Sequence, residues 1–587
     1  MLSAIAHRGV DGARLCVDGH TALGYQSFWT TPEEVNEYQP LTDTSNQLSI
    51  VFDGRLDNRA TLLKQLQNGD ASLAHCSDAT LVLSAYQHWG ERCPEHFLGS
   101  FAFLIYDHKT NKGFCARDPM GSRTLFYHDR GKTLLVASEE CALLAHPDIS
   151  DALNNDRLAS YFALQPPAMG DTFFKNIVEL LPAHSLSFAG EHSTLTGYWS
   201  PKLHTLSPDL GNKAYAEQFL EILNLSVEAR MRSITPVGAM LSGGMDSSPV
   251  AALAAKKLKA KDQTLRTYSW VFDELSACDE RSYIDACNQY FNSEATHIKG
   301  DDCWPYHYPN EWPFNPNTPE SNIFRHLKHR LYIASSANGS RVLLSGASGD
   351  LYYTGIDHWL VSNLRHQGIR TTLKAAHGIY QQWGLMALCR AMVRATGLRR
   401  PRITRHNAYS WMTSSSSHTA AAIRDAAIEP QDALRPAQQQ QLLGSYTANG
   451  VSRESYHAYK AGIDVRDPFL DLRLVEFMLS VPDHQLFGPD GFKQIVRNAT
   501  KGLLPEAVRL RPPNSSLEPL ARKGFEQLDR SRVCGSSSLT QDILASHINM
   551  DWLGNIIDNG PTSEQDMLAF WQIYSFELWM SQRDIPL

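Results

Sequence analysis

The segment that most constrains the fold is Leu241–Ser248, which reads LSGGMDSS. It follows the apolar segment TPVGAM and precedes an alanine-rich segment typical of a helix. Adjacent glycines let the backbone turn tightly and approach an anion closely, and the free N–H groups at a helix N-terminus bind anions. The run therefore predicts a phosphate-binding loop between a strand and a helix. Its candidate binding residues are Leu241, Ser242, Gly243, Gly244, Asp246, Ser247 and Ser248.

Asp246 is an acidic side chain inside this predicted anion site. A carboxylate beside phosphate groups is stable only if a cation lies between them, and Mg²⁺ is usually held by one or two carboxylates together with phosphate oxygens. We therefore predict that Asp246 is a Mg²⁺ ligand. The alternative is a glycine turn whose aspartate caps the helix, but the order of strand, loop and helix favours the phosphate site.

A second apolar segment, VLLSGASGD at residues 342–350, also ends in a glycine and serine loop. Loops at the carboxyl ends of parallel strands face the ligand crevice of an α/β sheet. This predicts Ser345 and Gly346 in the nucleotide site and Asp350 as a second Mg²⁺ ligand. Ser269 and Val271, at the end of another apolar segment, are predicted to line the adenine pocket. The alternatives are a turn aspartate for Asp350 and ordinary core packing for the other two.

A third segment, GFKQIVRNATKG at residues 491–502, places Lys493 and Arg497 after a glycine-containing turn. A lysine at this place is predicted to neutralise charge on pyrophosphate or on a tetrahedral intermediate, a contribution of about 3–4 kcal/mol. We take Lys493 and Arg497 as the catalytic candidates, the alternative being solvated surface side chains.

The pattern of the chain changes near residue 213. Before about residue 195 short apolar runs alternate with turn residues, which indicates strands, whereas later helices and apolar strands alternate, as in a doubly wound parallel sheet. We predict a first domain at 1–195, a linker at 196–212 and a second domain at 213–587. The second domain contains a basic helical insertion at about 358–450. Residues 358–410 hold nine Lys and Arg residues and no acid.

Composition excludes several classes of protein. The net charge of -8 argues against nucleic acid as a partner. The sequence has neither an apolar run long enough to cross a membrane nor a signal peptide. Its ten cysteines are scattered without C-x-x-C pairs, which is typical of reduced thiols and predicts a cytoplasmic protein.

These segments together resemble the asparagine synthetase family. SGGMDS resembles its ATP loop, LSGASGD its second loop, and DVRDPFLD and GFKQIVR its later elements. In the first half, HRGVDG, FDGRLDN, LGSFAFLIYD and RDPMGSRTLFY resemble the family's glutaminase domain. The resemblance implies an N-terminal Ntn-type αββα sandwich followed by a doubly wound α/β domain of the ATP pyrophosphatase type. It also implies ATP and Mg²⁺ as cofactors, with AMP and pyrophosphate as products.

The first half departs from that family where glutamine should bind. The family's catalytic cysteine follows the initiator methionine, and here that position is Leu2. Arg55 replaces an acid that holds the substrate ammonium, and Gln26 replaces an arginine that pairs with the glutamine carboxylate. Only Asp78 keeps the expected acid. We therefore expect a degenerate glutaminase domain that does not hydrolyse glutamine.

A synthetase without that ammonia source must use another amine. The stretch DGRLDNR and the basic insertion resemble those of lasso-peptide macrolactam cyclases, in which one peptide supplies both carboxylate and amine. The expected partners are carboxylate and amine substrates, a precursor peptide, and a leader peptidase or adapter protein. The alternatives are an asparagine synthetase using ammonia or glutamine, a non-catalytic nucleotide-binding scaffold, and a tRNA-modifying relative.

Overall fold

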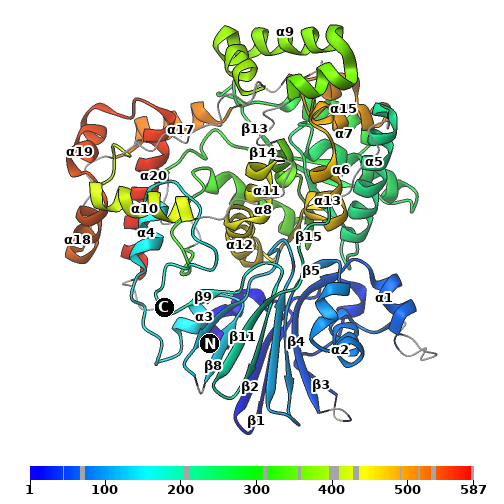
Figure 1. Ribbon diagram of the computed structural model, residues 1–587, viewed down its shortest axis with the longest axis vertical. Helices are drawn as coiled ribbons and strands as arrows, with labels where there is room; N and C mark the ends of the chain where they lie inside the picture. Colours follow the sequence, from blue (N-terminus) through cyan, green and yellow to red (C-terminus); the bar gives the residue numbers. More distant parts are fainter. Residues whose placement is uncertain are drawn as a thin grey trace.

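The structure of the chain is a computed structural model. It describes residues 1–583 except 44, 46, 67–72, 74, 132, 204–210, 308–313, 354–358, 396–408, 427–434, 489–490, 513–515 and 530–536. The β layers of the N-terminal part lie at one end of the molecule and the mixed C-terminal part at the other (Figure 1). The predicted domain boundaries stay predictions, and part of the predicted linker lies outside the described residues.

The N-terminal part is built on a six-stranded sheet of order β11-β10-β6-β5-β4-β3, in which neighbouring strands are antiparallel. Alternating apolar residues of its central strands, such as Phe52 opposite Phe103, pack with helix α2 into one buried core. The strands are β1 (Gly12–Asp18), β2 (Thr21–Ser27), β3 (Leu41–Asp43), β4 (Leu48–Leu56), β5 (Gly99–Asp107), β6 (Lys112–Arg117), β7 (Phe126–Asp129), β8 (Leu134–Ala137), β9 (Val178–Glu179), β10 (His184–Ala189) and β11 (His192–Gly197). The helices are η1 (Leu2–Arg8), α1 (Arg59–Leu66), α2 (Asp78–Trp89), α3 (Glu140–Leu144) and α4 (Asn155–Phe162).

A second β layer covers the other face of this sheet. It consists of the sheet β8-β7-β9 and the separate hairpin β1-β2. Helix α3 contacts β7 and β8, whereas α2 contacts β4 of the large sheet. The order of layers is therefore helix, sheet, sheet and helix, which confirms the predicted αββα sandwich.

The C-terminal part is built on a five-stranded parallel sheet of order β14-β13-β12-β15-β16. Strand β12 lies in the middle, where the chain order reverses on either side, so its carboxyl end opens into a crevice that suits a ligand. The predicted doubly wound sheet is confirmed. The strands are β12 (Gly238–Met240), β13 (Arg266–Val271), β14 (Glu294–Lys299), β15 (Val342–Leu344) and β16 (Asp464–Arg466), followed by the hairpin β17 (Phe487–Gly488) and β18 (Gly491–Phe492).

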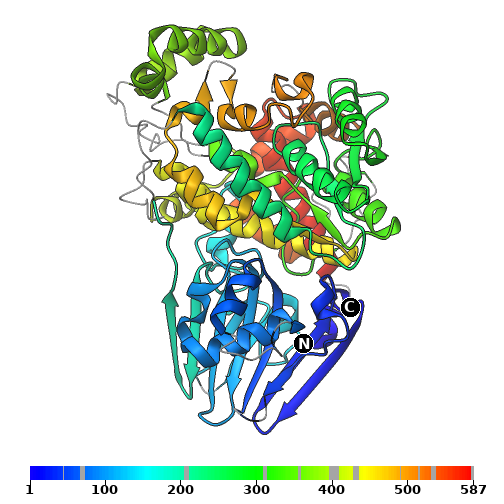
Figure 2. The same cartoon turned by 90° about the vertical axis from the view of Figure 1, so that its right-hand side faces the viewer.

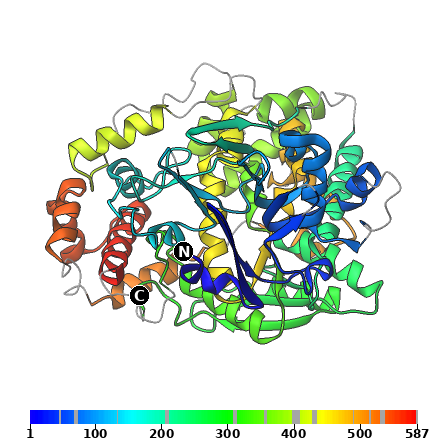
Figure 3. The ribbon, with the colours of Figure 1, turned by 90° about the horizontal axis from the view of Figure 1, so that it is seen from below.

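Helices surround this sheet, and most of the described residues in the predicted insertion are helical (Figure 2). They are α5 (Asn212–Arg230), α6 (Ser247–Lys259), α7 (Arg281–Phe291), α8 (Arg325–Ala337), η6 (Ala347–Tyr353), α9 (Trp359–Ala395), α10 (Ser414–Ala426), α11 (Pro436–Leu443), α12 (Ser445–Lys460), η7 (Pro468–Leu470), α13 (Leu472–Ser480), α14 (Asp483–Leu486), α15 (Gln494–Ala499), α16 (Glu506–Arg509), α17 (Glu518–Gln527), α18 (Ser538–His547), α19 (Met550–Asn559) and α20 (Glu564–Arg583). Helix α20 packs on α4 of the N-terminal part. The two ends of the chain lie on the same side of the molecule (Figure 3). None of the described helices is both long and apolar enough to cross a bilayer.

Candidate active site

The loop from β12 to α6 has the tight turn that its glycines predicted. Gly243 has a φ of +65°, and a Cβ there would lie 2.6 Å from Cβ of Tyr283, so a side chain fits neither the backbone nor the space. The Ser242 N–H donates to Oγ of Ser247 at 3.1 Å, and the two hydroxyls lie 3.0 Å apart. The loop therefore has a fixed shape at the start of α6.

The loop after β15 lies directly against this first loop. A Cβ on Gly346 would lie 2.6 Å from the carbonyl carbon of Asp246, and one on Gly349 would lie 2.4 Å from its Oδ1. The Ser345 N–H donates to the Arg466 carbonyl at 2.9 Å. Two glycines thus let the second predicted segment approach the first, as expected for neighbouring parallel strands.

Lys493 joins the acids of both loops. Its Nζ forms an ion pair with Asp246 and lies 2.6 Å from Oδ1 of Asp350. The residue lies between the β17–β18 hairpin and α15, with a φ of +64°. Its Nζ also lies 5.6 Å from the centre of the Tyr353 ring. The structure therefore brings together three predicted site residues, of which the first and the last lie more than 240 positions apart in the sequence.

Burial controls the charge of this cluster. It raises the pKa of Asp246 to about 6, although the neighbouring Lys493 opposes the shift. Burial acts to lower the pKa of Lys493, but the two aspartates raise it overall. Asp350 is 76% exposed, whereas Asp246 is 19% exposed. The lysine is therefore cationic, and its charge is fixed between an inner and an outer carboxylate.

The cluster fits a divalent cation bound together with phosphates. Oδ1 of Asp246 is buried without a hydrogen-bond partner, and Lys493 Nζ lies where a cation would bridge the two aspartates. Among the described residues no three His, Cys, Asp or Glu side chains form a metal-binding group. Two carboxylates hold Mg²⁺ only when phosphates and water complete its shell, so the arrangement suits a cation that enters with the nucleotide. The Mg²⁺ roles of both aspartates stay predictions.

The other predicted nucleotide residues take different positions. Leu241 is buried, and its N–H donates to the Tyr268 carbonyl at 3.0 Å, which places Ser269 beside the loop. Ser269 and Val271 are buried at the carboxyl end of β13, and the Ser269 hydroxyl has no hydrogen-bond partner. Their predicted place beside adenine is untested.

Ser248 and Arg497 point away from the aspartates and the lysine. The Ser248 hydroxyl lies 3.6 Å from the Cys287 thiol, in the contact between α6 and α7. Arg497 is 5% exposed, and it donates to the carbonyls of Phe492 and Arg509 at 3.0 and 2.6 Å. These contacts hold the segments around Lys493, and the catalytic role predicted for Arg497 is untested.

Sequence reasoning missed two side chains of this site. Asp467 is half-buried, and its Oδ2 accepts a hydrogen bond from the Ser348 N–H at 2.8 Å, which fixes the second loop. Arg511 donates to the Gly243 carbonyl at 2.9 Å and forms an ion pair with Glu280. The Asp467-Pro468 pair after β16 was a local signal for a capping turn, but nothing near Arg511 in the sequence pointed to the first loop.

We expect a single methyl group at Gly346 to disable this site. In Gly346→Ala the new Cβ would lie 2.6–2.7 Å from main-chain atoms of Asp246 and Ser247, which cannot move aside as a flexible side chain would. A displacement of about 1 Å at an active site costs on the order of 10²-fold in rate, and pyrophosphate release should fall by that factor. The control is Gly554→Ala in α19, where a Cβ meets nothing within 4 Å. Equal rates for the two variants would contradict the packing of the loops.

In the N-terminal part, two of the three residues predicted at the glutamine-binding positions are buried in ion pairs. Arg55 is 2% exposed and bonds Asp57 through Nε at 2.9 Å. Asp78 is 1% exposed, and it pairs with Arg59 and Arg232. Both side chains are therefore committed to contacts within the protein.

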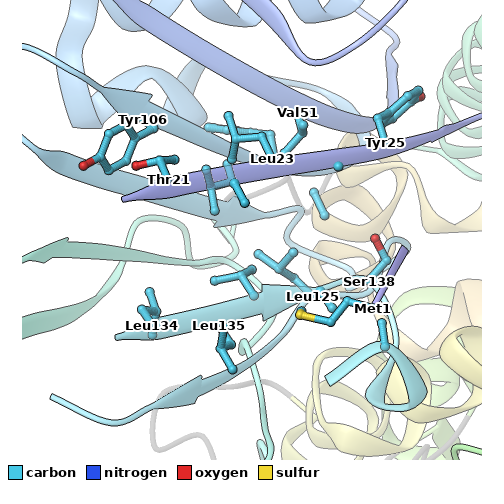
Figure 4. A pocket seen from close by; sticks show the side chains of 18 of the residues that line it. Met1, Thr21, Leu23, Tyr25, Val51, Tyr106, Leu125, Leu134, Leu135 and Ser138 are labelled. Carbon is cyan, nitrogen blue, oxygen red and sulfur yellow. The ribbon is translucent and has the colours of Figure 1, made fainter. Parts of the chain in front are cut away.

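The N-terminal β layers also enclose a cavity of about 1070 Å³. Apolar residues of β2 and β8, among them Leu23, Leu134 and Leu135, line it from opposite sides (Figure 4). Its inner end is formed by Arg8, which lies 2.5 Å from Asp53, and by Arg123. Arg123 pairs with Asp464 of β16 at 2.9 Å, so ion pairs line the cavity where it meets the C-terminal part.

Comparison with known proteins agrees with this architecture. A family model described as asparagine synthase matches residues 218–581, and one described as a glutamine amidotransferase domain matches residues 1–199. The chain is 24% identical over 543 residues to "Asparagine synthetase [glutamine-hydrolyzing] 3" of Bacillus subtilis (strain 168), covering 87% of this chain and 82% of the relative.

Other relatives match less of their length. The chain is 29% identical to a putative asparagine synthetase of Methanocaldococcus jannaschii over 48% of this chain and 52% of the relative. It is 26% identical to "Amidase chyE" of Penicillium rubens over 61% and 54%. A solved glutamine phosphoribosylpyrophosphate amidotransferase of Bacillus subtilis matches 52% of this chain and 79% of its own at 14% identity, but its TM-score of 0.25 supports no argument.

Proposed function

We propose that this protein closes a macrolactam ring within one peptide, as in lasso-peptide formation. The chain belongs to the asparagine synthetase family and is an ATP-dependent carbon–nitrogen ligase. In this reaction an Asp or Glu side chain is adenylated, and an amine of the same peptide displaces AMP. The partners we propose are a precursor peptide and the protein that prepares or delivers it, in the cytoplasm.

The observation that carries this proposal is the closure of the glutamine-binding positions. Asp78, which should hold the glutamine ammonium, pairs with Arg59 and Arg232 and is 1% exposed. Arg55 brings a positive charge to the neighbouring position and is buried against Asp57. The ammonium group of a glutamine substrate would have to displace buried ion pairs and would lie beside cations, and both are energetically unfavourable. The nitrogen is therefore supplied by an amine other than that of glutamine.

The first step places ATP on the two glycine loops. The N–H groups at the start of α6 bind the β- and γ-phosphates, and Arg511 keeps the first loop in shape through the Gly243 carbonyl. Asp246 and Asp350 would hold Mg²⁺, which supplies charge neutralisation of the pyrophosphate leaving group. The substrate carboxylate then attacks the α-phosphorus, which forms the acyl adenylate and releases pyrophosphate.

The second step joins the acyl group to nitrogen. The neutral amine attacks the acyl carbon, and the oxyanion that develops lies within reach of Lys493. AMP then leaves with the bonding electrons, and the proton that the nitrogen loses passes to the departing phosphate or to water. Lys493 stays protonated, because the two aspartates raise its pKa, and it can donate hydrogen bonds throughout. Ring closure is effectively unimolecular when both ends of one peptide are held in the site, and this proximity accounts for much of the rate.

The second candidate is an asparagine synthetase that uses free ammonia. It is favoured by the similarity to the Bacillus subtilis relative, which covers 87% of this chain. The same two loops and lysine would then adenylate free aspartate. The two candidates differ in the acyl acceptor and share the ATP chemistry.

The test is to incubate the purified protein with ATP and Mg²⁺ and one substrate set at a time. The sets are a synthetic peptide with a free N-terminal amine and an Asp or Glu side chain further along, aspartate with ammonium, and glutamine alone. We expect AMP, pyrophosphate and a peptide lighter by one water with the first set, and no glutamate with the third. Asparagine formation with no change in the peptide would favour the second candidate, and steady glutamate release would refute the argument from Asp78 and Arg55.

A further inference from the structure

Helix α9 is connected to both segments that form the site. It begins at Trp359, shortly after η6, which carries Asp350. It also packs on the β17–β18 hairpin: Ala375 is buried with Phe487 and Phe492, and residue 493 follows directly. The Asn363 side chain donates from Nδ2 to the Phe487 carbonyl at 3.0 Å. Helix α9 therefore contacts the hairpin that directly precedes Lys493.

The outer face of α9 carries an exposed apolar ridge. Ile369, Leu373 and Tyr380 are 65%, 63% and 46% exposed, and their spacing of four and seven residues places them on one side of a helix. Ala375 is buried on another side, against the hairpin. Three large apolar side chains held together in water indicate a surface that another molecule covers.

Positive charge lies beside this ridge. Arg370 and Lys374 are both exposed and are four residues apart, which places them on one line along the helix. The sequence of α9 contains no acidic residue, so no carboxylate of the helix itself neutralises these cations. In the views of Figures 1 and 2 the helix lies at the end of the molecule opposite the N-terminal β layers. This side of the described part of α9 therefore combines exposed apolar side chains with positive charge.

We propose that this face of α9, formed by Ile369, Leu373, Tyr380, Arg370 and Lys374, docks an acidic segment of the peptide substrate. The inference rests on the proposed function, because that function supplies the peptide. Apolar side chains of the segment cover the ridge, and its carboxylates pair with Arg370 and Lys374. Such a mode combines helix-face recognition with electrostatic steering of an acidic ligand.

Two other ligands fit this surface less well. A membrane surface needs one continuous apolar face. The other large exposed apolar side chains described on α9 are Leu364, Leu385 and Met392, and at about 100° per residue they do not lie on the side of the ridge. Nucleic acid is bound mainly through cations and hydrogen bonds to phosphates and base edges, and it makes little use of exposed aliphatic side chains. A peptide docked here would also raise the effective concentration of its reacting groups beside Lys493, because α9 contacts the hairpin that carries it.

The basic stretch that follows, with Arg399, Arg400 and Arg402, belongs to the same predicted insertion. These arginines lie outside the described residues, so the proposal rests on residues 369–380 alone.

The experiment measures binding of a fluorescent 16-residue probe peptide with Glu and Leu at helical spacing to the full-length protein. We expect Arg370→Glu/Lys374→Glu to weaken binding at least tenfold, and Ile369→Ser/Leu373→Ser to weaken it by a similar factor. The matched control is Lys109→Glu/Lys112→Glu, which makes the same change of charge at exposed sites in the N-terminal part. It should bind like the wild type, and all variants should keep the wild-type melting temperature and affinity for a fluorescent ATP analogue.

Separate arms use a probe with Lys in place of Glu, anionic phosphatidylglycerol vesicles and a 20-nucleotide RNA. The proposal predicts loss of binding with the Lys probe and no dependence of vesicle or RNA binding on Arg370 and Lys374. It is overturned if the α9 variants bind the acidic probe like the control, or if only vesicles or RNA discriminate between them. These readouts do not involve ring closure, so the docking proposal can fail while the proposed function stands. The reverse outcome is equally distinguishable, because probe binding is measured without turnover.

Discussion

Asp246→Ala is expected to abolish pyrophosphate release, with a loss of at least about 10³-fold. The variant removes the inner carboxylate of the cation site and leaves Asp350, which is 76% exposed and binds a cation more weakly because water competes for it. It also removes the partner that holds Lys493 against the first loop. The measurement is the rate of pyrophosphate formation with saturating ATP and substrate, at several Mg²⁺ concentrations.

Asp350→Asn is a second variant, in which the rate of pyrophosphate release is compared with that of Asp246→Ala. We expect a smaller loss that excess Mg²⁺ partly restores, because the buried Asp246 still anchors the cation. Asp262→Asn, an exposed aspartate after α6, should leave the rate unchanged. Near wild-type pyrophosphate release in Asp246→Ala would refute the assignment of the β12–α6 loop as the nucleotide site.

The site could be predicted from the sequence where its signals are local. The run Leu241–Ser248 carries its own turn, glycines and helix start within eight residues, so its shape depends little on the rest of the chain. Lys493 and Asp350 could be named because each follows a recognisable turn or strand. That Asp350 reaches Asp246 is a consequence of the parallel sheet, which the alternation of helices and strands predicts, whereas Lys493 reaches it from the separate β17–β18 hairpin.

The remainder depends on contacts between distant segments. Arg511 reaches the Gly243 carbonyl from 268 positions away, and Asp467 reaches the second loop across 119. Neither the composition nor the periodicity around these residues encodes such a contact. From the sequence, Arg55 could be identified only as a positive charge in place of a negative one. The structure shows that Asp57 compensates this charge.

Arg55 lies in a buried network that joins the two parts of the chain. It bonds Asp57 from Nε at 2.9 Å, and Asp57 in turn lies 3.2 Å from Arg230 of α5. Arg230 also pairs with Asp471 at 3.0 Å, and all four side chains are at most 3% exposed. Burial lowers the pKa of Arg55 to about 10 against the attraction of Asp57. The replaced glutamine-binding position therefore contributes to the contact between the two parts.

We expect Asp57→Leu to lower the free energy of unfolding by about 3–5 kcal/mol, because it leaves Arg55 buried without the carboxylate to which it is hydrogen-bonded. Arg230 keeps Asp471, so the main loss falls on Arg55. Urea unfolding followed by tryptophan fluorescence measures the change. The control is Arg92→Met, which breaks a pair whose arginine is 77% exposed and should change stability by less than about 1 kcal/mol.

The double variant Arg55→Met/Asp57→Leu separates an uncompensated charge from a simple loss of packing. Replacing both members of a buried pair by apolar side chains is often neutral or stabilising, since neither charge then has to leave water. We therefore expect the double variant to recover most of the stability that Asp57→Leu loses, and the non-additivity to report the coupling of the two side chains. If the double variant is no more stable than the single one, Arg55 is held by contacts other than its pair with Asp57. In that case the burial of Arg55 would no longer explain how the chain tolerates a positive charge at the former glutamine-binding position.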